Sequence, residues 1–277
     1  MSSDIEKTVP AARESSGFCR RCGKIHRLDS APAVAACISL MRQLEERQTI
    51  ELFRPAPHLS HLLTTDTLFG KSRGKMFGIL EGIDQNGRRV QLHAFSGQYN
   101  GIWDVPGWAP PLFDLPTFQQ INGAEEKNIK ALGRQLDKEK IHSPQWLALK
   151  KERKKRSRLL MEKLHGLYQL TNFRGETSSL HSAFSGPEGI PTGTGDCCGP
   201  KLLNQAALLG IKPYTMAEFF WGKENRSATR QHSWFYPPCR SKCKPILGFL
   251  LCGADRMKLP SRKELQIFSQ SINSRAA

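Results

Sequence analysis

Apolar residues recur with a helical period early in the chain. In residues 32–53 they repeat at intervals of three and four, so they would lie on one face of a helix. The positions that would share this face are Val34, Cys37, Ile38, Met41 and Leu44. We therefore predict a helix over 32–53 that packs its apolar side against the core.

The next stretch changes to the two-residue period of β-strands. The segments KMFGILEGI (75–83) and VQLHAF (90–95) flank a short polar turn, and the second alternates apolar and polar positions. Asn86-Gly87 in the turn supplies the positive φ angles that a tight hairpin needs. We predict a β-hairpin here, followed by an ordered loop over 97–117 that is rich in Gly, Pro and Trp. Two tryptophans would pack this loop: Trp103 and Trp108.

Residues 124–170 predict two helices that are broken near Ser143-Pro144. Each carries a leucine-rich stripe, and the second also carries a dense run of basic residues. That run consists of Lys150, Lys151, Arg153, Lys154, Lys155, Arg156 and Arg158. Such a run is typical of a solvated helix face; a phosphate-contacting surface and a nuclear-import signal are the alternatives.

A third helical pattern follows the sequence GDCC. Apolar residues recur at helical spacing over 202–209, and Gly210 is suited to the position after the helix end. YTMAEFFWG (214–222) predicts a strand, and the segment after PPC predicts another helix. A weaker helical pattern covers 261–272.

These elements predict an α+β fold, a mixed domain with a projecting basic helical hairpin as an insertion. The expected parts are a disordered tail (1–17), the N-terminal part of the domain (18–123), the basic hairpin (124–172) and a cysteine-rich C-terminal part of the same domain (173–277).

The excess of positive charge in the chain indicates a domain that binds a polyanion. Lys and Arg number 41 against 25 Asp and Glu, a net charge of +16. RNA is an abundant cellular polyanion, so we expect an RNA partner, with plain solubility as the other explanation. The first residues lack the apolar stretch of a secretory signal, and no apolar run is long enough for a membrane-spanning helix. We therefore expect a soluble intracellular protein, with the cytoplasm as the expected compartment and an organelle or the nucleus as the alternatives.

Six of the eight cysteines fall into three pairs, which favours metal binding over scattered core packing. The strongest combination joins GDCC to PCRSKC, because four soft sulfur ligands suit a closed structural zinc site. The predicted zinc ligands are Cys197, Cys198, Cys239 and Cys243. Adjacent cysteines seldom bind one ion, so one of the first two would be a core residue, with His181 or His232 as the fourth ligand.

A second cysteine pattern lies near the N-terminus. The sequence FCRRCGKIH places Cys19, Cys22 and His26 at the spacing of half a zinc site. No second half follows nearby, so the segment is either part of a site completed by distant residues or a flexible arm. Cys37 and Cys252 stand alone in apolar surroundings, and we expect both to be small core residues.

The same cysteines permit an enzymatic alternative. GDCCGPKLLNQAALLGI resembles the nucleophile helix of transglutaminase-like thiol enzymes, in which a strand and then a histidine beside an aromatic residue follow. Cys197 would be the nucleophile, His232 the base and Asp255 a weak candidate for the orienting group. Labelling and metal content would distinguish this hydrolase or transferase from a zinc-binding module.

Two further motif matches fail on their surroundings. A zinc deaminase needs Glu two residues after the first ligand, but Gly199 and Pro200 occupy those positions. The sequence HRLD (26–29) matches the catalytic motif of pseudouridine synthases, but it continues into a predicted helix instead of the expected Thr or Ser and Gly. We interpret HRLD as coincidence.

Four longer segments carry a resemblance that covers roughly residues 64–252. They are GKMFGILEG, LHAFSGQYNG, GTGDCCGPKLLNQAALLGIKPYTMAEFFWG and FYPPCRSKCKPILG. In this order they resemble the long N-terminal extension of large RluA-type RNA pseudouridine synthases. In those enzymes a separate C-terminal domain carries out the isomerisation, and the sequence has no catalytic aspartate in the proper context.

The resemblance implies an accessory module that acts beside RNA modification and is non-catalytic alone. Its RNA partner would be a tRNA or an rRNA, contacted by the basic run of 150–158, while the C-terminal cysteines hold a structural zinc. A protein or ribosome surface is a further alternative as partner.

Overall fold

The computed structural model describes residues 14–53, 60–70 and 72–257. It combines helices with antiparallel sheets, which confirms the predicted α+β class. The described strands form a three-stranded sheet and two separate two-stranded ribbons. The helix predicted over 261–272 and the first thirteen residues lie outside the described residues.

The central sheet has the strand order β4-β3-β7, with every pair antiparallel. Its strands are β3 (Lys75–Ile83), β4 (Arg89–Phe95) and β7 (Lys212–Trp221). The predicted hairpin is the β3–β4 pair, and Gly87 in its turn has a φ of 78°. The turn is fixed by the Asp84 carboxylate, which accepts hydrogen bonds from the backbone N–H groups of Asn86 and Arg88.

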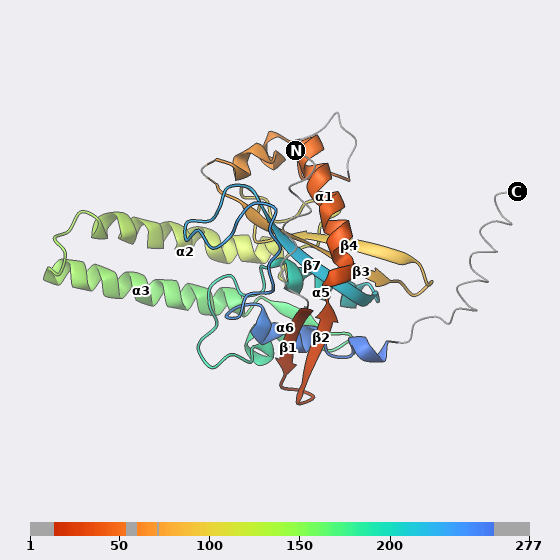
Figure 1. Cartoon of the computed structure of the whole chain (residues 1–277). Coiled ribbons are helices and arrows are strands. Elements are labelled where there is room, and N and C mark those ends of the chain that lie inside the picture. The colour runs from red at the N-terminus through yellow and green to blue at the C-terminus, as the bar shows by residue number, and fades with distance from the viewer. Residues whose placement is uncertain (1–13, 54–59, 71, 258–277) are drawn as a thin grey trace, which may run out of the picture.

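One helix covers each face of this sheet (Figure 1). On one face, α5 (Cys198–Leu208) packs onto Leu80 and Met216. On the other face, α1 (Val34–Arg47) packs onto Ile79 and Ala217, which are adjacent to those two residues in the strands. Because adjacent residues of a strand point to opposite faces, β3 is apolar on both sides, and this explains its nearly continuous hydrophobic run. The helix predicted over 32–53 ends early, at Arg47, where Gln48 adopts a left-handed conformation with φ 51°.

The two long helices α2 (Leu115–Leu136) and α3 (Pro144–His165) lie side by side and extend away from the central sheet (Figure 1). The predicted break is confirmed: Ser143 caps α3 by accepting from the Trp146 N–H, and Pro144 is the first helical residue. α2 begins inside the predicted loop, nine residues before 124, because Asp114 caps it and proline follows in its first turn. Trp103 packs against Phe113 and Phe118 at this end of the pair.

The N-terminal ribbon corrects the expectation of a disordered tail over 1–17. β1 (Glu14–Cys19) pairs with β2 (Lys24–Asp29), so an ordered strand starts at Glu14. The ribbon lies against α6 (Lys244–Leu250), the helix predicted after PPC (Figure 1). Gly17 and Gly248 meet backbone to backbone, and a Cβ on either residue would overlap the main chain of the other element.

The remaining elements are short and connect the layers. They are β5 (Gln169–Thr171), β6 (Thr177–Ser179), α4 (Leu180–Ala183) and four 3-10 turns at Ala31–Ala33, His61–Leu63, Asp66–Leu68 and Ala254–Arg256. Within the described ranges, no helix has the length and apolar character needed to cross a membrane.

The contact between Gly17 and Gly248 predicts that replacing Gly248 by alanine destabilises the protein. Gly248→Ala should lower the free energy of unfolding by about 1–3 kcal/mol or more, because the added methyl group overlaps the backbone of Phe18. Gly123→Ala is the matched control: it lies in α2 with no neighbouring atom near the added methyl, and should raise stability by about 0.5–1 kcal/mol. Urea unfolding of both variants measures the difference. Equal stability of the two would mean that β1 does not pack on α6.

Candidate metal centres

Three thiols from two separate segments of the C-terminal part of the chain lie close together. Cys197 precedes α5, whereas Cys239 and Cys243 precede α6. Their sulfur atoms all lie within 4.8 Å of one another, and the Sγ atoms of Cys239 and Cys243 are 3.4 Å apart. The sequence prediction that GDCC and PCRSKC converge therefore holds for these three residues, which could hold a metal ion.

Cys198 does not belong to this group. It is completely buried, and its thiol donates a hydrogen bond to the Met76 carbonyl oxygen of β3, at 3.2 Å. Successive residues of a helix point about 100° apart, so Cys197 and Cys198 at the start of α5 face different neighbours. Only three of the four predicted sulfur ligands therefore lie together. Of the adjacent residues Cys197 and Cys198, it is Cys198 that packs in the core.

The three thiols differ in the direction in which their pKa values are shifted. Hydrogen bonds from Cys197 and Cys243 lower the pKa of Cys239. The contact with Cys239, followed by burial, raises the pKa of Cys197, although the contact with Cys243 lowers it. The contacts with Cys197 and Cys239, followed by burial, raise the pKa of Cys243. One negative charge is therefore favoured on Cys239, and a cation is needed before all three sulfurs can be thiolates together.

A buried carboxylate stands beside these thiols. Glu218 of β7 is 6% exposed, and burial, followed by the charge of Cys239, raises its pKa to about 7. The backbone N–H of Gly199 interacts with this carboxylate and offsets part of the rise in pKa, while the Oε1 atom has no hydrogen bond of good geometry among the described residues. A buried oxygen of this kind can accept a hydrogen bond from a further donor at the site.

The two histidines proposed as a fourth ligand lie elsewhere. His232 accepts a hydrogen bond from the Gly222 N–H, and its ring packs on Trp221 and Phe69. His181 packs near His165. Neither joins the metal-binding groups of the described residues.

The same placement separates the residues of the thiol-enzyme alternative. No hydrogen bond or electrostatic interaction described for His232 involves Cys197. Asp255 lies in the turn after α6 and interacts with His26, not with His232. The structure does not bring the nucleophile, base and orienting group of that alternative together.

The N-terminal half-site is completed by a residue from the other end of the chain. Cys19, Cys22, His26 and Cys252 place their donor atoms within 4.8 Å of one another. Cys252 is buried, as expected, but its thiol faces this group, whereas Cys37 is a core residue whose thiol donates to the Ala217 carbonyl oxygen. Local sequence spacing could not predict Cys252 as a member of this group, because 230 residues separate it from Cys22.

The HRLD segment has a structural role in β2. Asp29 is its last residue, and the carboxylate accepts a hydrogen bond from the Ala31 N–H, which shapes the turn into α1.

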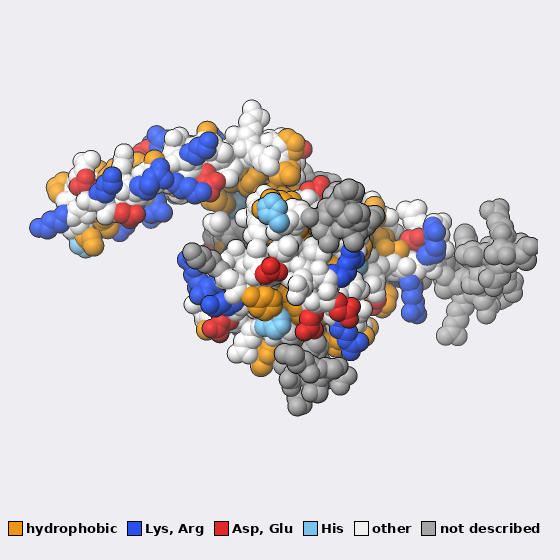
Figure 2. Space-filling view, turned by 90° about the horizontal axis from the view of Figure 1, so that it is seen from above, with side chains coloured by type: hydrophobic (Ala, Val, Ile, Leu, Met, Phe, Trp, Pro, Cys, Tyr) orange, Lys and Arg blue, Asp and Glu red, His pale blue; other side chains and the backbone are white. Residues whose placement is uncertain are grey.

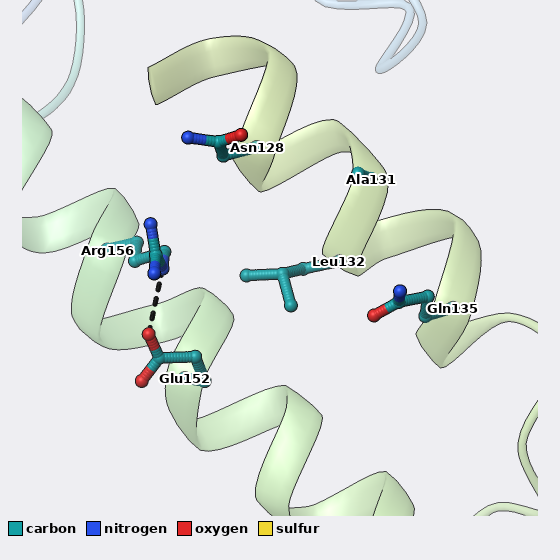
Figure 3. Close-up of a pocket in the computed structure, with 6 residues that line it drawn as sticks. All are labelled: Asn128, Ala131, Leu132, Gln135, Glu152 and Arg156. Carbon is teal, nitrogen blue, oxygen red and sulfur yellow. Dashed lines mark hydrogen bonds and ion pairs between the residues drawn. The ribbon is translucent and has the colours of Figure 1, made fainter. Parts of the chain in front are cut away.

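The basic residues of α3 divide into paired and unpaired groups. Arg156 bridges Glu125 of α2 and Glu152 of α3, and Arg158 pairs with Glu162. Figure 3 shows Arg156 and Glu152 beside a groove between the helices, which Asn128, Leu132 and Gln135 line from α2. The other predicted RNA contacts are exposed and have no ion pair with a described residue: Lys150, Lys151, Arg153, Lys154 and Lys155. Figure 2 shows Lys and Arg side chains along this helix pair.

Comparison with known proteins does not identify the chain. No family model, no curated protein and no solved structure matches it.

Substitutions can separate the thiol ligands from the core thiol. Cys239→Ser should lower the bound transition metal by one equivalent per chain relative to the unaltered protein, because two sulfurs alone bind weakly. Cys198→Ser should keep the metal, since its sulfur faces β3. Elemental analysis after dialysis against a weak chelator measures both. Loss of metal in Cys198→Ser with retention in Cys239→Ser would reverse the assignment.

Proposed function

We propose that this chain is an intracellular RNA-associated module, non-catalytic alone, that acts beside RNA modification. In this proposal α2 and α3 form a projecting basic hairpin that docks on tRNA or rRNA. Zinc held by Cys197, Cys239 and Cys243 stabilises the end of the domain where α5 and α6 begin. The resemblance of four segments to the N-terminal extension of RluA-type pseudouridine synthases supplies the link to RNA modification.

The observation that carries the proposal is the concentration of charge on the helix pair. Residues 115–165 contain thirteen Lys and Arg against six Asp and Glu, so about one fifth of the chain holds +7 of its net +16. α2 has no buried residue, and α3 buries only three, all near its end. A pair of helices that contributes so little to the core and carries so much charge is suited to contact a polyanion.

The ion pairs decide which side chains would contact phosphates. Arg156 is occupied by two carboxylates, so it holds the two helices together and is not free for RNA. Lys151, Lys154 and Lys155 are exposed and lie at helical spacings of three and four, which places them on one face of α3. This face would follow a phosphate backbone, while Lys150 lies over the Trp146 ring at 4.4 Å.

The chemistry of the three thiols supports zinc in a stabilising role. Zinc accepts thiolate ligands at tetrahedral positions, and three protein sulfurs leave one further position. When bound, zinc supplies a double positive charge that allows all three thiols to ionise. The Glu218 carboxylate would hydrogen-bond to the group in the fourth position.

Replacing the unpaired lysines tests the RNA proposal. Lys151→Ala, Lys154→Ala and Lys155→Ala in one protein should weaken binding to a tRNA pool and to ribosomal RNA fragments, and should reduce the slope of log affinity against log salt by about 2–3. Filter binding over a salt series measures both quantities.

A control must remove equal charge away from α3. Arg89→Ala, Lys223→Ala and Arg226→Ala in one protein meet this condition, because all three residues are exposed and lie outside the helix pair. This control should keep the affinity within about twofold. If both triple variants lose affinity equally, general charge and not the α3 face is responsible; if the unaltered protein does not bind RNA, the proposal fails.

A further inference from the structure

We infer that Cys19, Cys22, His26 and Cys252 form a second, closed zinc site, which fastens the N-terminal ribbon to the end of α6. This inference is independent of RNA binding and of zinc at the other three thiols. It concerns a set of residues that sequence spacing only half predicts.

The four donor atoms come from three neighbouring elements. Cys19 is the last residue of β1, Cys22 lies in the turn of the ribbon and His26 lies in β2. Cys252 follows α6 by two residues. Gly23 shapes the turn with a φ of 67°, and its N–H donates to the Cys19 carbonyl oxygen at 2.9 Å, so the C-x2-C loop is closed by the backbone.

The distances between the donor atoms are close to those of a tetrahedral zinc site. The Cys22 Sγ atom lies 3.1 Å from His26 Nε2 and 3.9 Å from Cys252 Sγ, and all four donors fall within 4.8 Å. With zinc–sulfur bonds of about 2.3 Å, two sulfur ligands of a tetrahedral ion lie about 3.8 Å apart. A zinc ion therefore requires only small movements of the side chains.

The donor set identifies the class of metal. Three thiolates and one imidazole are a common set for structural zinc, and they fill all four positions, so no place remains for a substrate. The contrast with the group at Cys197 is informative, because that group has three donors. α6 is seven residues long, about 10 Å of helix, and separates the two groups, so they would bind separate ions.

A cationic side chain contacts the sulfur atom of Cys252. The Arg174 Nε–H donates a hydrogen bond to Cys252 Sγ at 3.2 Å. A guanidinium donor stabilises a negatively charged sulfur and orients it, as outer-shell partners of metal ligands do. A buried thiol that served only for packing would need no such donor.

The N-terminal ribbon would gain stability from a metal site of this kind. β1 and β2 pair only with each other among the described strands, and two-stranded ribbons are marginally stable in water. The side of β1 that faces inward carries Ser15, Gly17 and Cys19, which bury little apolar area. A metal ion would add to the contacts that the ribbon makes with α6 and, through the buried Leu28 side chain, with the main core.

Metal content of the full-length chain tests the inference. Elemental analysis of protein purified under reducing conditions should give one zinc for this site in addition to any zinc at Cys197, Cys239 and Cys243. Cys252→Ser and His26→Ala should each lose one equivalent. His26→Cys should retain it, because a fourth thiolate replaces the imidazole, and this variant guards against loss of zinc through misfolding.

Two controls separate this site from the other. Cys239→Ser should lose a different equivalent, so the double variant with Cys252→Ser should lose both. Cys37→Ser should lose none, because Cys37 contacts the Ala217 carbonyl oxygen and neither group. Cobalt(II) substitution adds a spectroscopic readout: the visible absorption of tetrahedral thiolate-bound cobalt at this site should disappear in Cys252→Ser and persist in His26→Cys.

Three outcomes would overturn the inference. The first is an unchanged zinc content in both Cys252→Ser and His26→Ala. The second is a disulfide between two of the three cysteines, detected as the loss of two hydrogens by mass spectrometry of reduced-purified protein. The third is equal loss of zinc in His26→Ala and His26→Cys, which would mean that the substitutions act through folding and not through a ligand.

Discussion

The burial of α6 positions both thiol groups. Six of its seven residues are buried, between α5, the N-terminal ribbon and α4. Cys243 immediately precedes this helix, and Cys252 comes two residues after its end. Any displacement of α6 would therefore change the distances in both groups together, which makes the packing around it the common determinant of the two candidate centres.

The two groups nevertheless differ in what they can do. Four donors surround one position near the ribbon, whereas three donors form the other group, with the buried Glu218 carboxylate nearby. A complete donor set holds an ion without help from solvent. The two candidate centres therefore differ in how completely the described residues would enclose an ion.

Periodicity in the sequence was sufficient for the central sheet, whose buried positions are mostly apolar, and for the long helices, each of which carries a leucine-rich stripe. It failed for β1, whose inward side is formed by Ser15, Gly17 and Cys19, residues with little hydrophobic signal. It placed the start of α2 too late, because the cap at Asp114 lies within a Pro-rich segment. Local spacing found Cys239 with Cys243 and Cys19 with Cys22, but the choice of Cys197 over Cys198 and the role of Cys252 depend on tertiary packing that no local pattern contains.

The contact of β1 with α6 has a consequence for synthesis of the protein. The ribbon emerges from the ribosome before the helix that covers it, which lies more than 200 residues later in the chain. At about 5–20 residues per second, the ribbon waits roughly 10–45 s for its partner. During that interval Cys19 and Cys22 are exposed thiols on an unsupported segment, vulnerable to oxidation or to capture by the wrong cysteine. The packing of the ribbon thus has to wait for the synthesis of α6, although the residues of the ribbon are made well before that helix.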